Sequence, residues 1–261
     1  MIQQPEIEYI SKPASVSMAD AWFEIATEEH FWIQMRFLAI QKLFSKYLPD
    51  KGTFFEIGCG NCIFRDQVEN NLNISIDACD LYEFALKKAK KGRGRLMVYD
   101  IMEQNPSLLH KYDGVFLMDV VEHIKDDVSF LKAAANYVKP GGLIVINVPA
   151  LMSHYGKYDI EVGHYRRYNF KMMRTLFKEA RLEIIEMDYW FAFLLPLLVI
   201  RNFLLRFKKK EEIISTGFAP PGPFANKILH GLKNLELMLG IPFKKITGSS
   251  LLVIGRVQEI H

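Results

Sequence analysis

The chain has 261 residues, of which 50% are hydrophobic and 24% are charged. This is a globular composition with ample material for a core, and the length suits one large domain or one domain with a sizeable insertion. The formal net charge is only +3 at pH 7. Charge therefore gives little support to a nucleic acid or another polyanion as partner.

The chain contains three cysteines, Cys59, Cys62 and Cys79. A small, odd number without regular spacing is not a disulfide framework and indicates a reducing compartment, so we expect a cytoplasmic protein. Cys59 and Cys62 form a C-x-x-C pair, which zinc or redox chemistry could use. No second C-x-x-C and no well-spaced histidine pair completes four ligands, so we predict no metal.

No membrane-spanning segment is expected. Residues 1–14 are polar and lack the apolar region of a signal peptide. The most hydrophobic stretch, residues 190–207, is interrupted by Pro196, Arg201 and Asn202. It falls short of the roughly 20 uninterrupted apolar residues that a spanning helix needs. Contact with a membrane surface stays open.

The predicted elements begin with a helical region. Residues 19–47 have a helical pattern with a dense cluster of aromatic side chains. From residue 54 to residue 148, short β-branched runs then alternate with helical patterns, which is typical of βαβ units and a parallel sheet. The expected strands are 53–57, 74–80, 96–100, 114–118 and 143–148, and the expected helices include 63–70, 83–90 and 128–138.

One turn signal and a long gap complete the organisation. Lys139-Pro-Gly-Gly142 should end a helix and turn the chain into the next strand. A helix over 171–180 and strands over 182–189 and 251–257 follow. The roughly 60 residues before the last strand exceed an ordinary connection. We therefore predict an N-terminal helical cap (1–50), a core (51–190 and 250–261) and an inserted helical, lid or membrane-surface segment (191–249).

The strongest motif is Glu56-Ile57-Gly58-Cys59-Gly60. A strand ends there, glycines allow a sharp turn, and the following helix presents N–H groups to a ligand. Twenty residues past Gly60, Asp80 ends the second predicted strand, where a carboxylate can accept both ribose hydroxyls.

Two details of the motif favour a cationic adenosine cofactor over NAD. The dinucleotide fingerprint has a third glycine three residues after the second, and this chain has Ile63 there. Glu56 would also repel a pyrophosphate while suiting a positively charged ligand. The missing glycine likewise argues against a nucleotide-dependent oxidoreductase.

At these residues the chain resembles the class I S-adenosylmethionine-dependent methyltransferases of the bacterial small-molecule and glycan type. The resemblance covers residues 53–148. It rests on an ordered set of five motifs: Glu56-Ile-Gly-Cys-Gly60, Asp80, Asp100-Ile101, Asp113-Gly-Val-Phe-Leu-Met-Asp-Val-Val-Glu-His123 and Lys139-Pro-Gly-Gly142.

This resemblance implies a doubly wound, seven-stranded, mostly parallel α/β sheet of Rossmann-like type, with residues 251–257 as its antiparallel strand. It implies S-adenosylmethionine as cofactor. The residues that it places at the cofactor are Glu56, Gly58, Cys59, Gly60, Asp80, Leu81, Asp100, Ile101, Met118 and Asp119.

The acceptor side has several candidates in the loop Asp119-Val-Val-Glu-His123. The resemblance places His123 near the donor methyl, so it is a candidate general base, although it could instead cap or pack the next helix. Asp119, Glu122 and His123 could alternatively bind a divalent cation, as in some quinone-pathway O-methyltransferases that this segment resembles. The loop lacks the Asn/Asp-Pro-Pro-aromatic pattern of nucleic-acid amino methyltransferases, so we expect no nucleic-acid partner.

A second loop follows the fifth predicted strand and resembles one in bacterial methyltransferases often found with glycan and lipid biosynthesis genes. His154, His164 and Tyr165 could position or deprotonate a hydroxyl there. Arg166 and Arg167 could clamp a phosphate or carboxylate, or could pair with acids and hold the loop to the domain.

Two further segments bear on the acceptor. Trp32 belongs to an aromatic cluster that could be core packing or an acceptor-binding wall. Residues 190–210 join an apolar stretch to Arg206, Lys208, Lys209 and Lys210. That combination suits a membrane interface or a channel for a lipid-linked acceptor, and homodimer contacts or an acceptor lid explain it equally well.

The sequence thus predicts direct displacement, in which an acceptor oxygen attacks the sulfonium methyl group in line. The expected acceptor is a small molecule, a sugar or a lipid-linked glycan with a free hydroxyl. N-methylation of an amine or small peptide, and a cofactor-binding partner protein without catalysis, are the alternatives.

Overall fold

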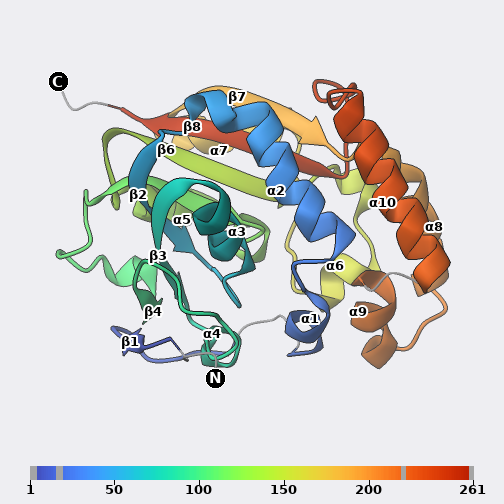
Figure 1. The fold of residues 1–261 in the computed structure, drawn as a ribbon, viewed down its shortest axis with the longest axis horizontal. Coiled ribbons are helices and arrows are strands. Elements are labelled where there is room, and N and C mark those ends of the chain that lie inside the picture. The colour runs from blue at the N-terminus through green and yellow to red at the C-terminus, as the bar shows by residue number, and fades with distance from the viewer. Residues whose placement is uncertain (1–4, 16–19, 219–221, 259–261) are drawn as a thin grey trace.

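Eight strands form one mixed sheet in a computed structural model of the chain, which describes residues 5–15, 20–218 and 222–258 (Figure 1). The strand order is β1-β4-β3-β2-β5-β6-β8-β7. Only β8 runs antiparallel to its neighbours. The bounds are β1 Ile7–Tyr9, β2 Lys51–Ile57, β3 Asn73–Asp80, β4 Leu96–Val98, β5 Tyr112–Met118, β6 Val138–Pro149, β7 Leu182–Trp190 and β8 Ser250–Val257.

The predicted doubly wound, mostly parallel fold is confirmed, with one strand more than the seven expected. The extra strand is β1, which pairs in parallel with β4, Ile7 opposite Leu96. The N-terminal segment is therefore not wholly helical. Three residues without a long alternating pattern carry too little signal to predict such an edge strand.

Helices cover both faces of the sheet (Figure 1). Their bounds are α1 Asp20–Ile25, α2 Phe31–Phe44, α3 Ile63–Asn71, α4 Glu83–Leu86, α5 Asp127–Ala135, α6 Lys157–Glu161, α7 Phe170–Glu179, α8 Leu195–Leu205, α9 Lys210–Phe218 and α10 Pro223–Met238. Helices α5 and α7 bury apolar side chains against one face, and α2, α3, α8 and α10 do so against the other.

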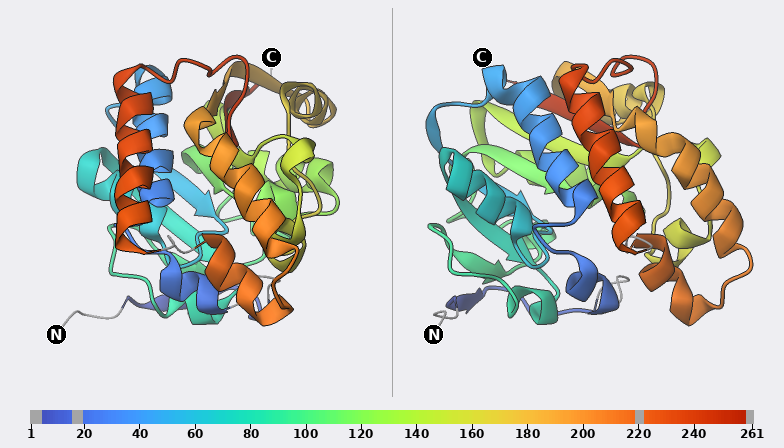
Figure 2. Two further views of the ribbon diagram at one scale, coloured as in Figure 1. Left: turned by 90° about the vertical axis from the view of Figure 1, so that its right-hand side faces the viewer. Right: turned by 45° about the vertical axis from the view of Figure 1, so that its right-hand side comes forward.

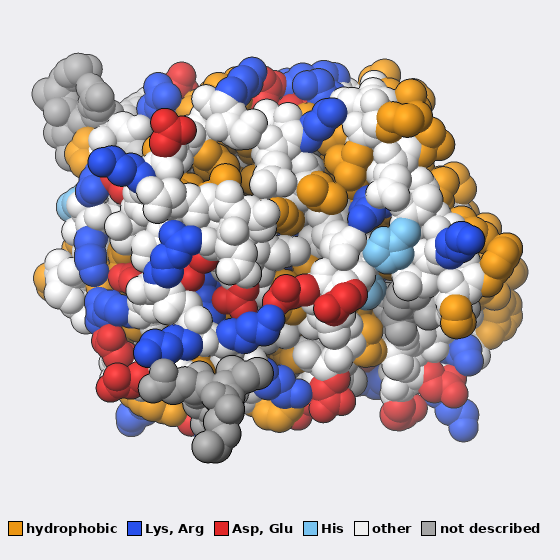
Figure 3. Space-filling model, viewed as in Figure 1, with side chains coloured by type: hydrophobic (Ala, Val, Ile, Leu, Met, Phe, Trp, Pro, Cys, Tyr) orange, Lys and Arg blue, Asp and Glu red, His pale blue; other side chains and the backbone are white. Residues whose placement is uncertain are grey.

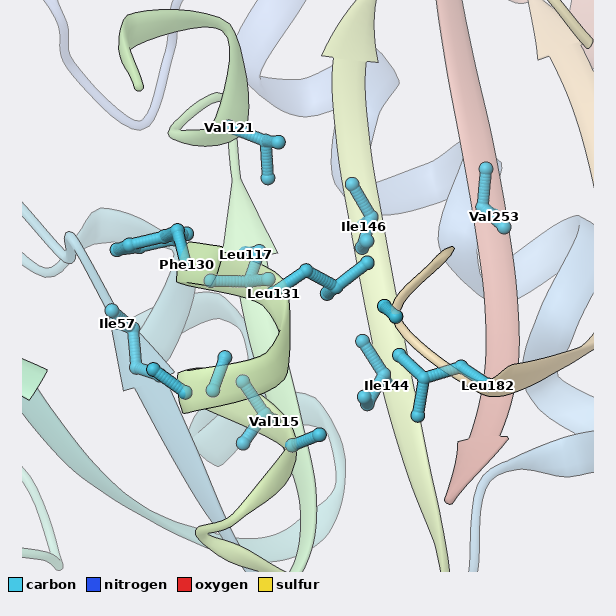
Figure 4. Close-up of a cluster of buried hydrophobic side chains, with 14 of the residues drawn as sticks. Ile57, Val115, Leu117, Val121, Phe130, Leu131, Ile144, Ile146, Leu182 and Val253 are labelled. Carbon is cyan, nitrogen blue, oxygen red and sulfur yellow. The ribbon is translucent and has the colours of Figure 1, made fainter. Parts of the chain in front are cut away.

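Alternate residues of each central strand supply the two cores, as expected for a sheet buried on both faces. Val115 and Leu117 of β5 lie in the core under α5, whereas Phe116 lies in the core under α2 and α3. Figure 4 shows Phe130 and Leu131 of α5 over these strands. This two-sided burial leaves the carboxyl ends of the strands free to form a site.

Two segments have structures that differ from those expected. The helical region 19–47 is broken between α1 and α2, where the His30 Nδ1 atom accepts a hydrogen bond from the Trp32 amide at 3.2 Å and caps α2. After α5, strand β6 already begins at Val138, before Lys139-Pro-Gly-Gly142. The register between β5 and β6 shifts there, so proline and glycines form a bulge instead of a turn before the strand.

The described residues between β7 and β8 include three α-helices, α8, α9 and α10, that fold back over the sheet. Helix α10 lies beside α2, and α9 lies beside α1 (Figure 2). The Phe218 ring at the end of α9 stacks on His30 with ring centroids 4.2 Å apart, and His30 Nε2 donates to the Phe218 carbonyl oxygen at 3.0 Å. The N-terminal segment and the insertion therefore close over the same side of the core.

Candidate active site

A cavity of about 350 Å³ lies at the carboxyl ends of β2, β3 and β5, under α1, α2 and α9. This is the edge where open α/β sheets bind their ligands. All ten predicted cofactor residues line this cavity: Glu56, Gly58, Cys59, Gly60, Asp80, Leu81, Asp100, Ile101, Met118 and Asp119. Among the predicted acceptor residues, Trp32, His123, His164 and Arg167 line it as well.

The glycine turn after β2 requires glycine at its first position. Gly58 has a φ of +71°, and a Cβ there would lie 2.6 Å from the Val120 Cγ2 atom. A larger residue would strain the backbone and push the loop after β5 away. Gly58 and Val120, which approach each other closely, therefore both line the cavity.

The Asp80 carboxylate is held at the end of β3 by backbone amides. Its Oδ2 atom accepts from the Gly60 N–H at 2.8 Å, and its Oδ1 atom accepts from the Tyr82 N–H at 2.8 Å. Burial raises the pKa of Asp80, and the backbone hydrogen bonds oppose that rise. A carboxylate oxygen has more than one lone pair, so each oxygen can accept a further hydrogen bond, as a pair of ribose hydroxyls requires.

Glu56 is a buried acid whose Oε2 atom has no hydrogen-bond partner among the described residues. Burial raises the pKa of Glu56 to about 8. A positively charged ligand in the cavity would favour the carboxylate and give it a partner. Together with the glycine turn and Asp80, this acid makes the cavity fit S-adenosylmethionine, which carries a sulfonium and an ammonium charge.

Asp119 is fixed on the opposite wall in a strained conformation. Its φ is +61°, unusual for a residue with a side chain. Arg36 Nη1 donates to its Oδ2 atom and Asn147 Nδ2 donates to its Oδ1 atom, both at 2.7 Å. Asn147 Oδ1 in turn accepts from Trp190 Nε1 at 2.9 Å. This network ties α2, β6 and β7 to the loop after β5.

His164 is oriented by Asp159, a residue that the sequence did not single out. The Nδ1 atom of His164 lies 2.9 Å from Asp159 Oδ1, which also accepts from Arg167 Nε at 2.7 Å. Burial would raise the pKa of Asp159, but the hydrogen bond from His164 and the charge of Arg167 hold it at about 2. An Nδ1–H that donates to this carboxylate leaves Nε2 of His164 as a proton acceptor at the cavity wall.

His123 and Glu122 lie next to His164. The rings of His123 and His164 are 4.7 Å apart and nearly perpendicular. Burial, and then repulsion from the His164 ring when that ring is protonated, lowers the pKa of His123 to about 3, so the His123 imidazole is neutral. Neither carboxyl oxygen of Glu122 has a hydrogen-bond partner among the described residues, and burial raises the pKa of this acid well above its usual range.

The residues that could bind a cation at this loop differ from the predicted Asp119, Glu122 and His123. One atom from each of Glu122, His123 and His164 lies within 4.8 Å of the others. Asp119 is outside this group because Arg36 and Asn147 engage both of its oxygens. The C-x-x-C pair is buried with its Sγ atoms 3.4 Å apart, and no other metal-binding type of residue joins it within the described part of the chain.

Three predicted acceptor residues lie outside the cavity lining. Arg166 donates to Asp127 Oδ2 at 2.6 Å, and the Tyr165 side chain is 55% exposed. His154 lies behind the wall, where Asn202 Nδ2 donates to its carbonyl oxygen at 2.7 Å. Arg166 pairs with Asp127 and Arg167 pairs with Asp159. These pairs agree with the alternative in which the arginines bind acidic side chains and hold the loop to the domain.

Aromatic side chains from both flanking segments roof the cavity. They are Trp22, Phe23, Phe31, Trp32 and Phe218. The Trp22 and Phe218 ring centroids are 5.2 Å apart, so the roof joins the N-terminal segment to the insertion. Burial lowers the pKa of His30, which holds Phe218, to about 4. The roof is therefore uncharged and apolar.

Comparison with known proteins gives the family. Residues 31–187 match the family described as a methyltransferase domain. The ubiquinone biosynthesis O-methyltransferase of Neisseria meningitidis serogroup C is 26% identical over 99 residues, which cover 34% of this chain and 40% of that protein. Malonyl-[acyl-carrier protein] O-methyltransferase 2 of Ilyobacter polytropus is 31% identical over 98 residues, covering 35% and 37%. The alignments thus span about 40% of the length of these curated relatives.

Solved structures share the fold. Phosphoethanolamine N-methyltransferase 2 of Haemonchus contortus, in complex with S-adenosyl-L-methionine, superposes with a TM-score of 0.56 at 18% identity, covering 88% of this chain and 53% of that one. The [4+2]-cyclase SpnF superposes with a TM-score of 0.55 at 13% identity, covering 87% and 81%. Because the family match covers more than half of the chain, the chain belongs to the methyltransferase-domain family.

Proposed function

We propose that the chain methylates a hydroxyl oxygen of a small acceptor that has an apolar part. The observation that carries this proposal is the pair of Asp159 and His164 at the cavity wall. A hydroxyl is a weak nucleophile until its proton is removed, whereas a neutral amine already offers a lone pair. A base that is oriented by a carboxylate is therefore more useful for oxygen than for nitrogen.

The residues would divide the work as follows. The glycine turn, Asp80 and Glu56 would hold S-adenosylmethionine, which when bound supplies an electrophilic methyl group for direct displacement. Nε2 of His164 would accept the hydroxyl proton, and Asp159 would stabilise the resulting imidazolium. The enclosing roof would exclude water and keep the two reactants in line.

The names of the curated relatives support transfer to oxygen, since both relatives above are called O-methyltransferases. The aromatic roof, together with Leu194 and with Leu198 of α8, favours an acceptor with an aromatic or lipid portion over a free sugar. A lipid-linked glycan combines a hydroxyl with such a portion. The proposed inserted segment, residues 191–249, would then act as the lid over the acceptor.

A matched panel of acceptors tests this function. We expect release of S-adenosylhomocysteine and an O-methyl product with 4-butylphenol or octyl glucoside, and none with 4-butylaniline. A coupled assay measures the release of S-adenosylhomocysteine, and mass spectrometry identifies the methylated product. Turnover of the aniline alone would instead support N-methylation. Tight cofactor binding without turnover of any acceptor would support the non-catalytic alternative.

We also propose that the outward face of α8 rests on a membrane surface. Val199, Ile200, Phe203, Leu204 and Phe207 recur at helical spacing and are between 54% and 76% exposed. Figure 3 shows hydrophobic side chains gathered along the edge where Figure 1 places α8 and α10. None of the described helices is both long and apolar enough to cross a membrane. An apolar face on a short helix suits the interface.

Basic residues at the end of α8 favour an anionic surface. Lys208 and Lys210 have acidic partners at 3.4 and 3.7 Å, and Arg206 and Lys209 are exposed beside them. A second copy of the chain is the alternative occupant of this face.

Vesicle flotation distinguishes the two occupants. The protein should float with vesicles containing phosphatidylglycerol, and the double variant Phe203→Glu/Phe207→Glu should lose about tenfold or more of this binding, because it places two charges in the interface. Met102→Glu, a matched change at an apolar residue that is 50% exposed elsewhere, should bind as the wild type does. A concentration-dependent dimer that the double variant abolishes, without vesicle binding, would refute membrane contact.

A further inference from the structure

Three arginines line the described part of the cavity, and only two of them have a carboxylate partner. Arg36 lies 2.7 Å from Asp119 and Arg167 lies 2.7 Å from Asp159. No carboxylate oxygen lies within 4 Å of the Arg201 guanidinium among the residues that the structure describes. An enclosed cation without a counter-ion loses hydration and gains no ion pair in return.

The surroundings of Arg201 leave its donors available to a ligand. The guanidinium lies over the Tyr158 ring, with its carbon 4.6 Å from the ring centroid. Its neutral acceptors are Asn202 Oδ1 at 3.1 and 3.3 Å and the Gly217 carbonyl oxygen at 3.3 Å, all at the long end of the range. Stacking on an aromatic ring holds the plane of the guanidinium, and these bonds use three of its five N–H groups. The second N–H of Nη1 and that of Nη2 remain to bind an oxyanion in a bidentate manner.

The local electrostatics also favour an anion. Burial, opposed by Tyr158 and reinforced by the positive charge of Arg167, lowers the pKa of Arg201 to about 10, so it remains a cation at neutral pH. Burial and the charges of Arg167 and Arg201 lower the pKa of the neighbouring His154. Asp159 is the acid that raises the pKa of Arg201, but its carboxylate already pairs with Arg167 and His164. Arg201 therefore has no direct ion-pair partner among the described residues of the wall.

We propose that Arg201 anchors an acid group of the acceptor, so that the acceptor is an anionic hydroxyl compound carrying a carboxylate or a phosphate. This inference rests on the proposed function in one respect, that the acceptor occupies the cavity under the roof. It assigns the anion contact to α8 instead of to Arg166 and Arg167, which have acidic partners.

The position of Arg201 on α8 also defines the shape of the acceptor. Leu194, the N-cap residue of α8, and Leu198 within the helix precede Arg201 and line the same cavity. The acid group would therefore bind beside an apolar wall, with the hydroxyl directed towards His164. Because the opposite face of α8 is the exposed apolar one, an amphiphile could enter the cavity from along this helix.

Calorimetric titration of the full chain, saturated with S-adenosylhomocysteine, tests the anchor. The probes are 3-(4-hydroxyphenyl)propanoate, its neutral amide and 4-hydroxyphenyl phosphate. We expect the wild type to bind at least one anion about tenfold or more tightly than the amide. The carboxylate and the phosphate arms show which oxyanion the site prefers.

Variants separate the anchor from a general effect of charge. Arg201→Gln should remove the preference for the anion, and Arg201→Lys should keep part of it. Arg174→Gln is the matched control, because Arg174 is an exposed arginine on α7 that lies outside the cavity. Thermal melting and S-adenosylhomocysteine affinity, unchanged in Arg201→Gln, would show that the fold is intact; if Arg201→Gln melts early, Arg201→Lys alone is compared with the wild type.

The outcomes distinguish this inference from the proposed function. A wild type that binds neither anion, or binds anions and amide equally, overturns the anchor, as does an unchanged preference in Arg201→Gln and Arg201→Lys. Methyl transfer to a hydroxyl acceptor would still uphold the proposed function in that case. Loss of the preference in Arg201→Gln without any methyl transfer would uphold the anchor and refute the function.

Discussion

Replacing His164 by asparagine is expected to lower the rate of methyl transfer to a hydroxyl acceptor by about 10²–10⁴-fold, the usual contribution of a positioned general base. The side-chain amide of asparagine can still donate a hydrogen bond to the Asp159 carboxylate, so the loop should keep its structure. Cofactor affinity should change little, because His164 lies at the acceptor side of the cavity. Steady-state rates at saturating cofactor, together with calorimetry, measure both quantities.

Two further variants make the assignment specific. Asp159→Asn should lower the rate by a smaller factor, because the imidazole loses its orienting carboxylate but remains a base. His110→Asn is the matched control, since His110 lies at the amino end of β5 and outside the cavity lining. Full activity in His164→Asn combined with a large loss in His123→Asn would move the base to His123.

Replacing Asp80 by asparagine is expected to weaken binding of S-adenosylmethionine by about 100-fold or more. The carboxylate accepts two backbone N–H bonds and offers its remaining lone pairs to the cavity. An amide has only one oxygen and would turn an N–H donor towards Gly60 or Tyr82. Lost charge-assisted bonds of about 1.5–3 kcal/mol each give this factor, since 1.4 kcal/mol corresponds to tenfold. Calorimetry measures the dissociation constant directly.

The control for this variant is the same substitution at an aspartate near the amino ends of the strands, away from the cavity. Asp113 Oδ2 accepts from the Thr53 N–H at 2.8 Å and lies outside the cavity lining. Asp113→Asn should cost stability without changing cofactor affinity. Equal affinity of Asp80→Asn and the wild type would show that Asp80 only shapes the turn.

The central part of the fold could be predicted from the sequence because its signals are local. The strands from β2 to β5 end within two residues of the expected positions, since each β-branched run stops at a turn residue. The glycine turn and Asp80 belong to consecutive strands of a parallel pair, so their carboxyl ends must meet at one edge. For the same reason, all ten predicted cofactor residues line one cavity.

The acceptor side could be predicted only in part, because its contacts join segments that are far apart in the chain. The second loop offered His154, His164, Tyr165 and two arginines with equal weight. Only the folded loop shows that His164 and Arg167 point to the cavity, while Tyr165 and Arg166 point away from it.

The sequence by itself determined most of the sheet and the cofactor edge, because periodicity, glycine turns and strand-end acids act over a few residues. The class of chemistry followed from the resemblance of the ordered motifs to the methyltransferases. Only the tertiary structure decided the partners of the buried charges. Arg36 reaches Asp119 across 83 positions of sequence, and Arg201 has no carboxylate partner among the residues that the structure describes. An unpaired charge costs free energy when it is buried. The packing of distant helices therefore decides which buried charge has a partner within the protein and which can bind a charged ligand.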